Sequence, residues 1–87
     1  MTLRDVVEML ESVGDYVTIY AEKPWTAESR AIVADDDELE HDGLPYFLEA
    51  HLAKDAVVAL EERRGETSAD ERLAAVLHYA AHDAFVD

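Results

Sequence analysis

The stretch that decides the fold is residues 16–26, which read YVTIYAEKPWT. β-Branched and aromatic residues dominate 16–22 and alternate along it, which predicts a β-strand. Because bulky side chains fall on both of its faces, we expect this strand to be central in its sheet or covered on its second side by loop residues. Pro24 cannot donate a hydrogen bond to a neighbouring strand, so the strand ends before the turn at 23–26.

Two further strands are predicted after this turn. Residues 31–34 (AIVA) form a short one, joined to the first by a connection of roughly eight residues. Pro45 opens the third strand, which runs from about Tyr46 to Leu52 and alternates in apolar character. Between them, residues 35–43 (DDDELEHDG) have no apolar period and predict a solvated acidic loop within a single domain, 1–87.

The first of three helices is predicted before these strands. Apolar residues recur at helical spacing over residues 3–13. Thr2 and Asp5 have the spacing of a capping box with Asp in place of Glu, which marks the start. Gly14 is the expected terminator.

The other two helices are predicted in the C-terminal half. The second spans residues 53–64 and stops at Gly65, although the pair at 57–58 (VV) leaves open a continued strand. Ser68 and Glu71 form a capping box for the third, which runs nearly to the end of the chain. Its core stripe consists of Leu73, Val76, Leu77, Ala80 and Ala84.

The order α-β-β-β-α-α predicts an α+β domain. It implies a three-stranded antiparallel sheet with helices packed on one face. A sheet this narrow has two edges close to its centre, which leaves room for dimerisation through a strand or a helix.

The chain is strongly acidic: 21 Asp and Glu residues stand against 7 Lys and Arg, for a formal net charge of -14. Such a surface repels itself in dilute buffer, but at molar salt the Debye length falls to roughly 3 Å and the repulsion is screened. Abundant alanine with only two lysines, Lys23 and Lys54, resembles haloarchaeal protein composition. We interpret the charge as an adaptation to a salt-rich cytoplasm; the alternative is an acidic protein that docks onto a basic partner.

Composition argues against several classes of function. Nucleic acids and anionic membranes are disfavoured as partners because both are bound through Lys and Arg, and no apolar run approaches the roughly 18 residues of a spanning helix. The absence of cysteine removes disulfides and thiolate chemistry. The three glycines stand alone, so no phosphate-binding loop is present, and we expect no cofactor and no catalytic residue. A cytoplasmic location is expected because the N-terminus lacks the apolar core of a secretion signal.

The acidic loop 35–42 is a candidate site for calcium or magnesium, because carboxylate oxygens are the ligands these ions prefer. An EF-hand loop carries Gly at its sixth position, whereas the sixth residue from Asp35 is Glu40. The spacing therefore favours a solvated loop that attracts cations loosely, and we predict no specific metal site there.

The outer face of the third helix is a candidate interface. His78 and His82 are four residues apart and share one face, as two metal ligands would, but Tyr79 replaces the Glu of a zinc-protease helix and no third ligand is indicated. The alternative is a contact surface for a partner or a second copy, because this face is unusually apolar. Its residues are Ala74, Ala75, His78, Tyr79, Ala81 and Phe85.

The turn around Trp25 is a second candidate binding site. Trp, Tyr and Arg dominate binding hot spots, and the segment combines them with Lys23. Its predicted binding residues are Tyr20, Glu22, Lys23, Trp25, Arg30 and His51. The competing interpretation is that Trp25 is structural and packs over the open end of a small hydrophobic core.

Residues 18–26 (TIYAEKPWT), with 31–33 (AIV) and 46–49 (YFLE), carry a family resemblance. They are similar to a family of short uncharacterised proteins of haloarchaea and bacteria marked by the T-I-Y-A-E-K-P-W motif. The resemblance covers roughly residues 1–60 and leaves out the third helix. No activity is established for that family, so the resemblance implies no function.

Two functional hypotheses follow. The first is a non-enzymatic module, adapted to high salt, that binds an unknown protein partner or itself as a homodimer through the Trp25 turn or the outer face of the third helix. The second is a small-molecule-binding or catalytic domain whose pocket is lined by Tyr20, Trp25, Arg30 and His51, with Arg30 pairing an anionic group.

Overall fold

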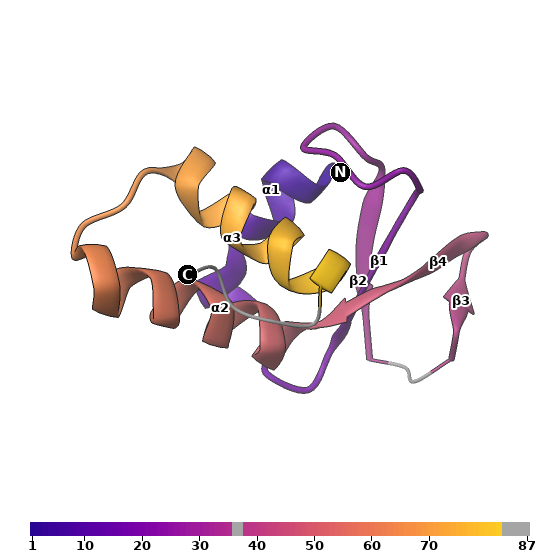
Figure 1. Cartoon of the computed structure of the whole chain (residues 1–87). Helices are drawn as coiled ribbons and strands as arrows, with labels where there is room; N and C mark the ends of the chain where they lie inside the picture. The colour runs from indigo at the N-terminus through magenta and orange to yellow at the C-terminus, as the bar shows by residue number, and fades with distance from the viewer. Residues whose placement is uncertain (36–37, 83–87) are drawn as a thin grey trace.

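Strand β1 (Thr18–Ala21) lies inside a four-stranded antiparallel sheet with the order β2-β1-β4-β3. The computed structural model describes residues 1–35 and 38–82, and Figure 1 shows its three α-helices on one side of the sheet. The predicted α+β class and the central position of β1 are confirmed. The predicted three-stranded sheet is wrong, and the order along the chain contains four strands before α2.

The elements follow one another with short connections. In chain order they are α1 (Leu3–Glu8), the 3₁₀ turn η1 (Leu10–Ser12), β1 (Thr18–Ala21), β2 (Ala31–Ala34), β3 (Glu40–His41), β4 (Leu44–Glu49), α2 (Ala50–Arg64) and α3 (Ala69–His82).

The additional strand, β3, lies in the segment predicted to be a loop. It pairs with β4 through Glu40 opposite Pro45 and His41 opposite Leu44. The two residues between them, Asp42 and Gly43, both have positive φ, 51° and 79°. Two-residue hairpin turns require this conformation and favour Asp-Gly, so the local turn residues prevail over the acidic composition.

Strand β4 ends earlier than predicted. Helix α2 begins at Ala50, so His51 and Leu52 are helical rather than extended. The alternation of 46–52 continues past the strand, but the residues buried along α2 have helical spacing and the Ala50 amide donates to the Val17 carbonyl at 2.9 Å. The tertiary contact therefore fixes where the strand becomes a helix.

A register irregularity in β4 brings two consecutive side chains into the core. Ile19 pairs with Leu48 but Tyr20 pairs with Tyr46, so Phe47 is the extra residue. Phe47 and Leu48 are both buried in the same hydrophobic cluster. Because a bulge reorients side chains locally, the predicted division of these residues onto opposite faces is wrong.

The helix signals are largely confirmed. The Thr2–Asp5 capping box is present, and Gly65, with φ of 79°, follows the last residue of α2. The predicted first helix is divided: α1 ends at Glu8 and η1 continues the same buried face to Val13. Within the described residues, no helix is long and apolar enough to cross a membrane.

The two faces of β1 are buried by different parts of the chain. Ile19 and Ala21 belong to the core cluster shared with the helices. Tyr20 is also fully buried, and its hydroxyl donates to the Glu38 carbonyl at 2.8 Å while its ring lies 5.5 Å from the ring of His41. The second face is therefore covered by the segment leading into β3, as expected for a strand with bulky residues on both sides.

Candidate functional site

The connection between β1 and β2, residues 22–30, forms what we call the Trp25 loop. The Trp25 indole Nε1 donates to the Ala21 carbonyl at 3.2 Å, and its ring meets Phe47 edge-on with ring centroids 4.9 Å apart. The Lys23 ammonium lies 4.9 Å from the centre of the Trp25 ring. The half-buried tryptophan is therefore fixed by a hydrogen bond, an aromatic contact and a cation–π contact.

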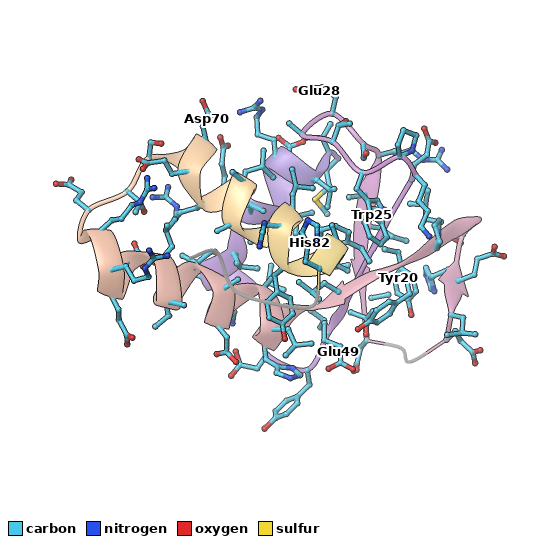
Figure 2. All side chains as sticks on the ribbon, in the orientation of Figure 1. Tyr20, Trp25, Glu28, Glu49, Asp70 and His82 are labelled. Carbon is cyan, nitrogen blue, oxygen red and sulfur yellow. The ribbon has the colours of Figure 1, made fainter. Side chains whose placement is uncertain are left out.

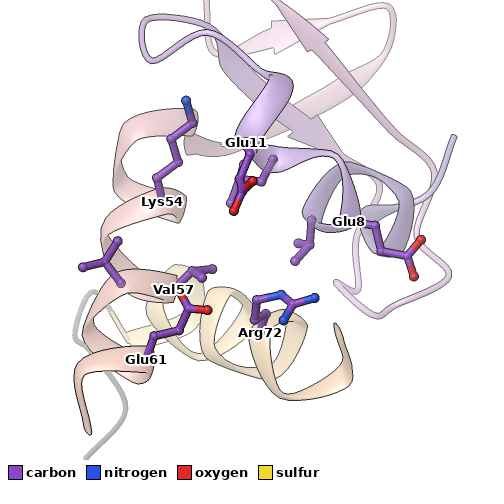
Figure 3. Close-up of a pocket in the computed structure, with 9 residues that line it drawn as sticks. Glu8, Glu11, Lys54, Val57, Glu61 and Arg72 are labelled. Carbon is purple, nitrogen blue, oxygen red and sulfur yellow. The ribbon is translucent and has the colours of Figure 1, made fainter. Parts of the chain in front are cut away.

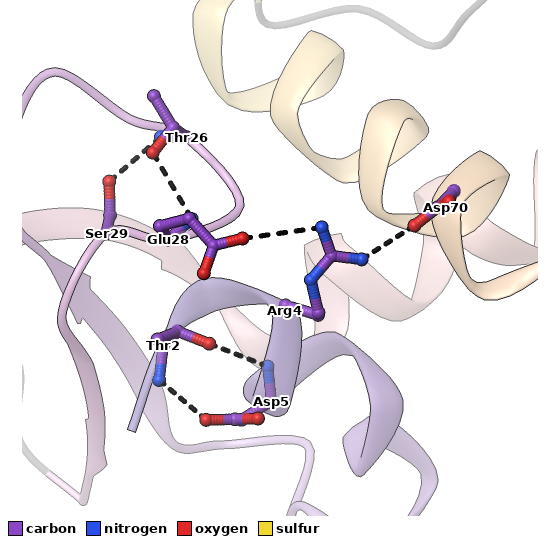
Figure 4. A network of polar contacts seen from close by, with 7 residues as sticks. All are labelled: Thr2, Arg4, Asp5, Thr26, Glu28, Ser29 and Asp70. Carbon is purple, nitrogen blue, oxygen red and sulfur yellow. Dashed lines mark hydrogen bonds and ion pairs between the residues drawn. The ribbon is translucent and has the colours of Figure 1, made fainter.

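A buried serine holds the loop together from inside. Ser29 is 7% exposed, its Oγ donates to the Pro24 carbonyl at 2.9 Å, and the same Oγ accepts from the Thr26 amide at 2.8 Å. The Ser29 amide donates in turn to the Thr26 carbonyl at 3.1 Å. The peptide bond between Lys23 and Pro24 is cis. The Ser29 side chain therefore links both ends of the turn at 24–29, and Figure 4 shows its contact with Thr26.

The loop also caps α1. The Leu3 amide donates to the Ser29 carbonyl at 2.9 Å, and the Arg4 amide donates to the Ala27 carbonyl at 3.1 Å. The remaining two amides of the first turn are satisfied within the capping box between Thr2 and Asp5, at 2.9 and 3.3 Å. These hydrogen bonds lower the pKa of the Asp5 carboxyl. All four amides that a helix start normally leaves unpaired therefore have partners.

Arg4 connects the loop to α3. Its guanidinium contacts Asp70 at 2.6 Å and Glu28 at 3.5 Å, and the hydrogen bond to Asp70 raises the pKa of Arg4 (Figure 4). All three side chains are well exposed, and exposed ion pairs contribute little to stability. The contact therefore orients the loop against α3 more than it stabilises the fold.

Three charged side chains of the Trp25 loop form no ion pair with another described residue: Glu22 is anionic, and Lys23 and Arg30 are cationic. Among the described residues, Lys23 and Arg30 are in no ion pair, whereas Arg4, Lys54 and Arg64 each have a carboxylate partner. Glu22 and Arg30 face each other across the base of the loop, where the Glu22 amide donates to the Arg30 carbonyl at 2.9 Å. The loop of this acidic molecule thus carries two cations without a carboxylate partner among the described residues, and one of them, Lys23, lies over the only tryptophan in the sequence.

The predicted binding residues are divided by the fold. Glu22, Lys23, Trp25 and Arg30 lie together in the loop. Tyr20 is buried on the face of β1 away from the helices. His51 is in the first turn of α2, and its Nε2 lies 3.5 Å from the Glu49 carboxylate. Glu49 pairs with Thr18 at the end of β1 remote from the loop (Figure 2). The structure therefore does not place Tyr20 or His51 beside Trp25.

The outer face of α3 is less open than predicted. Ala75 is 2% exposed and belongs to the core, so its assignment to an interface is wrong. Tyr79 is half-buried and packs against the core cluster. Ala74, Ala81 and His82 are exposed, and His78 is half-buried with its ring 4.6 Å from that of His82. Phe85, and Ala84 of the predicted core stripe, lie outside the described residues. The described part of the chain holds no group of three or more His, Asp or Glu residues placed to bind a metal.

The sequence reasoning missed a groove on the helical side of the molecule. This α1–α2 groove has a volume of about 540 Å³ and lies between α1 with η1 and α2 (Figure 3). The adjacent valines at 57–58, ambiguous in the sequence, were its one local signal. Its lining residues are Val7, Glu8, Leu10, Glu11, Lys54, Val57, Val58, Glu61 and Arg72.

The fold and the loop define a small α+β domain with a braced aromatic turn. A family model described as a domain of unknown function, DUF7716, matches residues 1–87, and the chain belongs to that family. The prediction that the chain belongs to an uncharacterised family is confirmed, and the match includes α3. No curated protein and no solved structure matches the chain.

Proposed function

We propose that this domain is a non-enzymatic protein-binding module of a salt-rich cytoplasm, and that the Trp25 loop is its contact surface. The observation that carries the proposal is the preorganisation of the loop: Ser29, Ala21 and the first turn of α1 hold it, and Trp25 stays partly accessible beside the Lys23 ammonium. A rigid surface loses little conformational entropy on binding. Tryptophan and arginine are also the residues enriched at binding hot spots.

The partner is another protein or a second copy of the chain. Affinity capture of the tagged protein from a halophile lysate in molar KCl tests the first, and sedimentation of the pure protein tests the second. The variant Lys23→Ala/Arg30→Ala removes the two unpaired cations, which are both exposed, and with them the cation–π contact of Lys23 with Trp25. His82→Ala on α3 is the matched control.

The outcomes distinguish the two candidate surfaces. We expect the wild type and His82→Ala to retain the same stoichiometric partner or dimer, and the loop variant to lose it. Loss in His82→Ala alone would transfer the function to the outer face of α3. A strictly monomeric protein that recovers only itself would refute the proposal.

High-salt adaptation is a separate part of the proposal and rests on the net charge of -14. Repulsion within such a surface weakens as the Debye length falls, so stability should rise with KCl. The urea midpoint measured from about 0.1 to about 3 M KCl tests this, across the range where screening becomes complete. A midpoint that stays constant would favour the alternative, an acidic protein matched to a basic partner at ordinary salt.

One observation favours a second function, the binding of a small anion. Lys23 and Arg30 are both exposed in the loop that carries Trp25, and a guanidinium recognises carboxylate or phosphate groups in bidentate geometry. Titration with small carboxylates and inorganic phosphate at constant ionic strength, followed by Trp25 fluorescence, tests it. An unchanged emission spectrum would remove this alternative and leave the protein-binding function.

A further inference from the structure

The α1–α2 groove exists because the helices around it do not pack on one another evenly. Helix α2 packs mainly on η1 and α3, while α1 packs on α3, so a hollow remains between α1 and α2. Figure 3 shows Glu8 and Glu11 on one wall, Glu61 on the other and Arg72 at the α3 end. The volume of about 540 Å³ is in the range of binding pockets.

The floor of the groove is apolar and partly open to solvent. Val7 and Leu10 form its base and are each 5% exposed. Val57 is half-buried above them, and Val58 on the lip of α2 is 50% exposed. Val58 therefore adds apolar surface that a partner lying in the groove could contact.

The two cations of the groove are already engaged by the protein itself. The Lys54 ammonium donates to the Val13 carbonyl and pairs with Asp15 at 2.6 Å, which lowers the pKa of the Asp15 carboxyl. The Arg72 guanidinium donates to the Thr67 carbonyl at 2.7 Å. Lys54 is thus neutralised by Asp15, while Arg72 is held by the neutral oxygens of Thr67 and forms no ion pair with another described residue.

The carboxylates of the groove remain available. Glu8, Glu11 and Glu61 are exposed, and none of them is in an ion pair with another described residue. Figure 3 shows Glu11 and Glu61 turned toward the groove and Glu8 at its outer rim on α1, with its carboxylate turned away from α2. A ligand that fits must therefore carry an apolar stripe flanked by positive charges.

We propose that the α1–α2 groove is the docking site for a basic amphipathic α-helix of a partner protein. An amphipathic helix places apolar residues at i, i+3, i+4 and i+7 on one face, which suits a floor made by two flanking helices. Lys or Arg on its flanks would reach Glu8 and Glu61. At molar salt the valine floor supplies most of the affinity, because screening leaves only direct charge contacts. The inference concerns a different surface from the Trp25 loop and does not rest on it.

A model peptide tests the proposal. The probe is a labelled amphipathic peptide of about 15 residues, long enough to form a helix on binding, with a leucine stripe and lysine flanks. Its control has the same composition in scrambled order, which keeps the charge and destroys the leucine stripe.

Binding is measured by fluorescence anisotropy of the labelled peptide, at the lowest KCl concentration at which circular dichroism shows that the protein is folded. Methyl NMR follows Val57 and Val58. We expect the scrambled peptide to bind on the order of tenfold more weakly, because it cannot bury its leucines together.

Two pairs of variants locate the contact. Val58→Ser should weaken binding about tenfold by removing apolar contact, while Leu39→Ser, at a more exposed apolar position outside the groove, should not. Glu8→Gln/Glu61→Gln should weaken binding, while Asp55→Asn/Glu62→Gln removes the same charge from α2 outside the groove and should not. Equal binding of both peptides or by all variants would overturn the proposal. So would displacement of the peptide by spermine with no dependence on Val58, which would indicate a site for small cations.

Discussion

The Trp25 loop and the α1–α2 groove adjoin opposite ends of α1 and use their charged groups in opposite ways. In the loop, backbone and hydroxyl groups satisfy one another and two cations, Lys23 and Arg30, are left without carboxylate partners among the described residues. In the groove the cations are engaged and three carboxylates are left over. The net charge of the chain therefore does not predict the charge that each surface offers to a partner.

The largest effect we expect distinguishes the two surfaces by stability. Trp25→Ala removes the edge-on contact with Phe47 and the hydrogen bond to Ala21, and should lower the free energy of unfolding by about 2–4 kcal/mol. Val58→Ala in the groove should change it by less than about 0.5 kcal/mol, because that side chain is half exposed. Urea unfolding at constant molar KCl measures both. Comparable losses would mean that the groove, too, is part of the structural core.

Ser29→Ala tests whether the loop is held from inside. Removing the hydroxyl leaves the Pro24 carbonyl and the Thr26 amide without their buried partner, so the free energy of unfolding should fall by about 1–3 kcal/mol. The emission of Trp25 should shift as its environment loosens. Ser12→Ala, an exposed position outside the loop, is the control and should leave both readouts unchanged. A stable variant with unaltered emission would contradict the preorganised loop.

The two capping boxes give a smaller and sharper comparison. Thr2→Ala at the loop end of α1 and Ser68→Ala at the start of α3 should each cost about 1 kcal/mol, the usual value for an N-cap. Only Thr2→Ala should also change Trp25 emission, because the loop carbonyls bind the same helix turn. An equal fluorescence response from both variants would indicate that the loop is coupled to the whole helical layer.

Much of the fold could be predicted because its signals are local. Both capping boxes, the stop at Gly65 and strand β2 depend on a few neighbouring residues. Strand β3 was missed although Asp42-Gly43 is a hairpin turn signal, because the acidic residues around it suggested only solvation. The start of α2 was not predictable from spacing alone, since apolar alternation continues through His51. The hydrogen bond that fixes the start joins the Ala50 amide to the carbonyl of Val17, which is remote in the sequence.

The candidate site was predictable only in its residue types. Trp25 with Lys23 and Arg30 was an evident hot-spot composition, but its bracing depends on Ser29 and on the start of α1, contacts that no local pattern encodes. Ala75 was assigned to an outer face because small residues do not report which side of a helix is buried. The groove depends on how α1 and α2 diverge over α3, and this is a property of the packing rather than of either helix.

The smallest effect we expect is the dependence of stability on pH. Hydrogen bonds lower the pKa of Asp5 at the loop end of α1, of Asp15 beside Lys54 and of Glu71 in the α3 cap. A carboxyl whose pKa is lower in the folded state contributes stability above its unfolded pKa, about 4, and loses it as pH falls through the folded value.

At low salt, protonation of the other carboxylates offsets this loss of stability by relieving repulsion, whereas molar KCl removes the offset. The urea midpoint in molar KCl should therefore fall between about pH 5 and pH 3. It should fall less steeply in Asp5→Asn, which keeps only Asp15 and Glu71 of these three carboxyls. An identical slope in that variant would show that Asp15 and Glu71, at the groove and the α3 cap, carry the acid sensitivity without the loop.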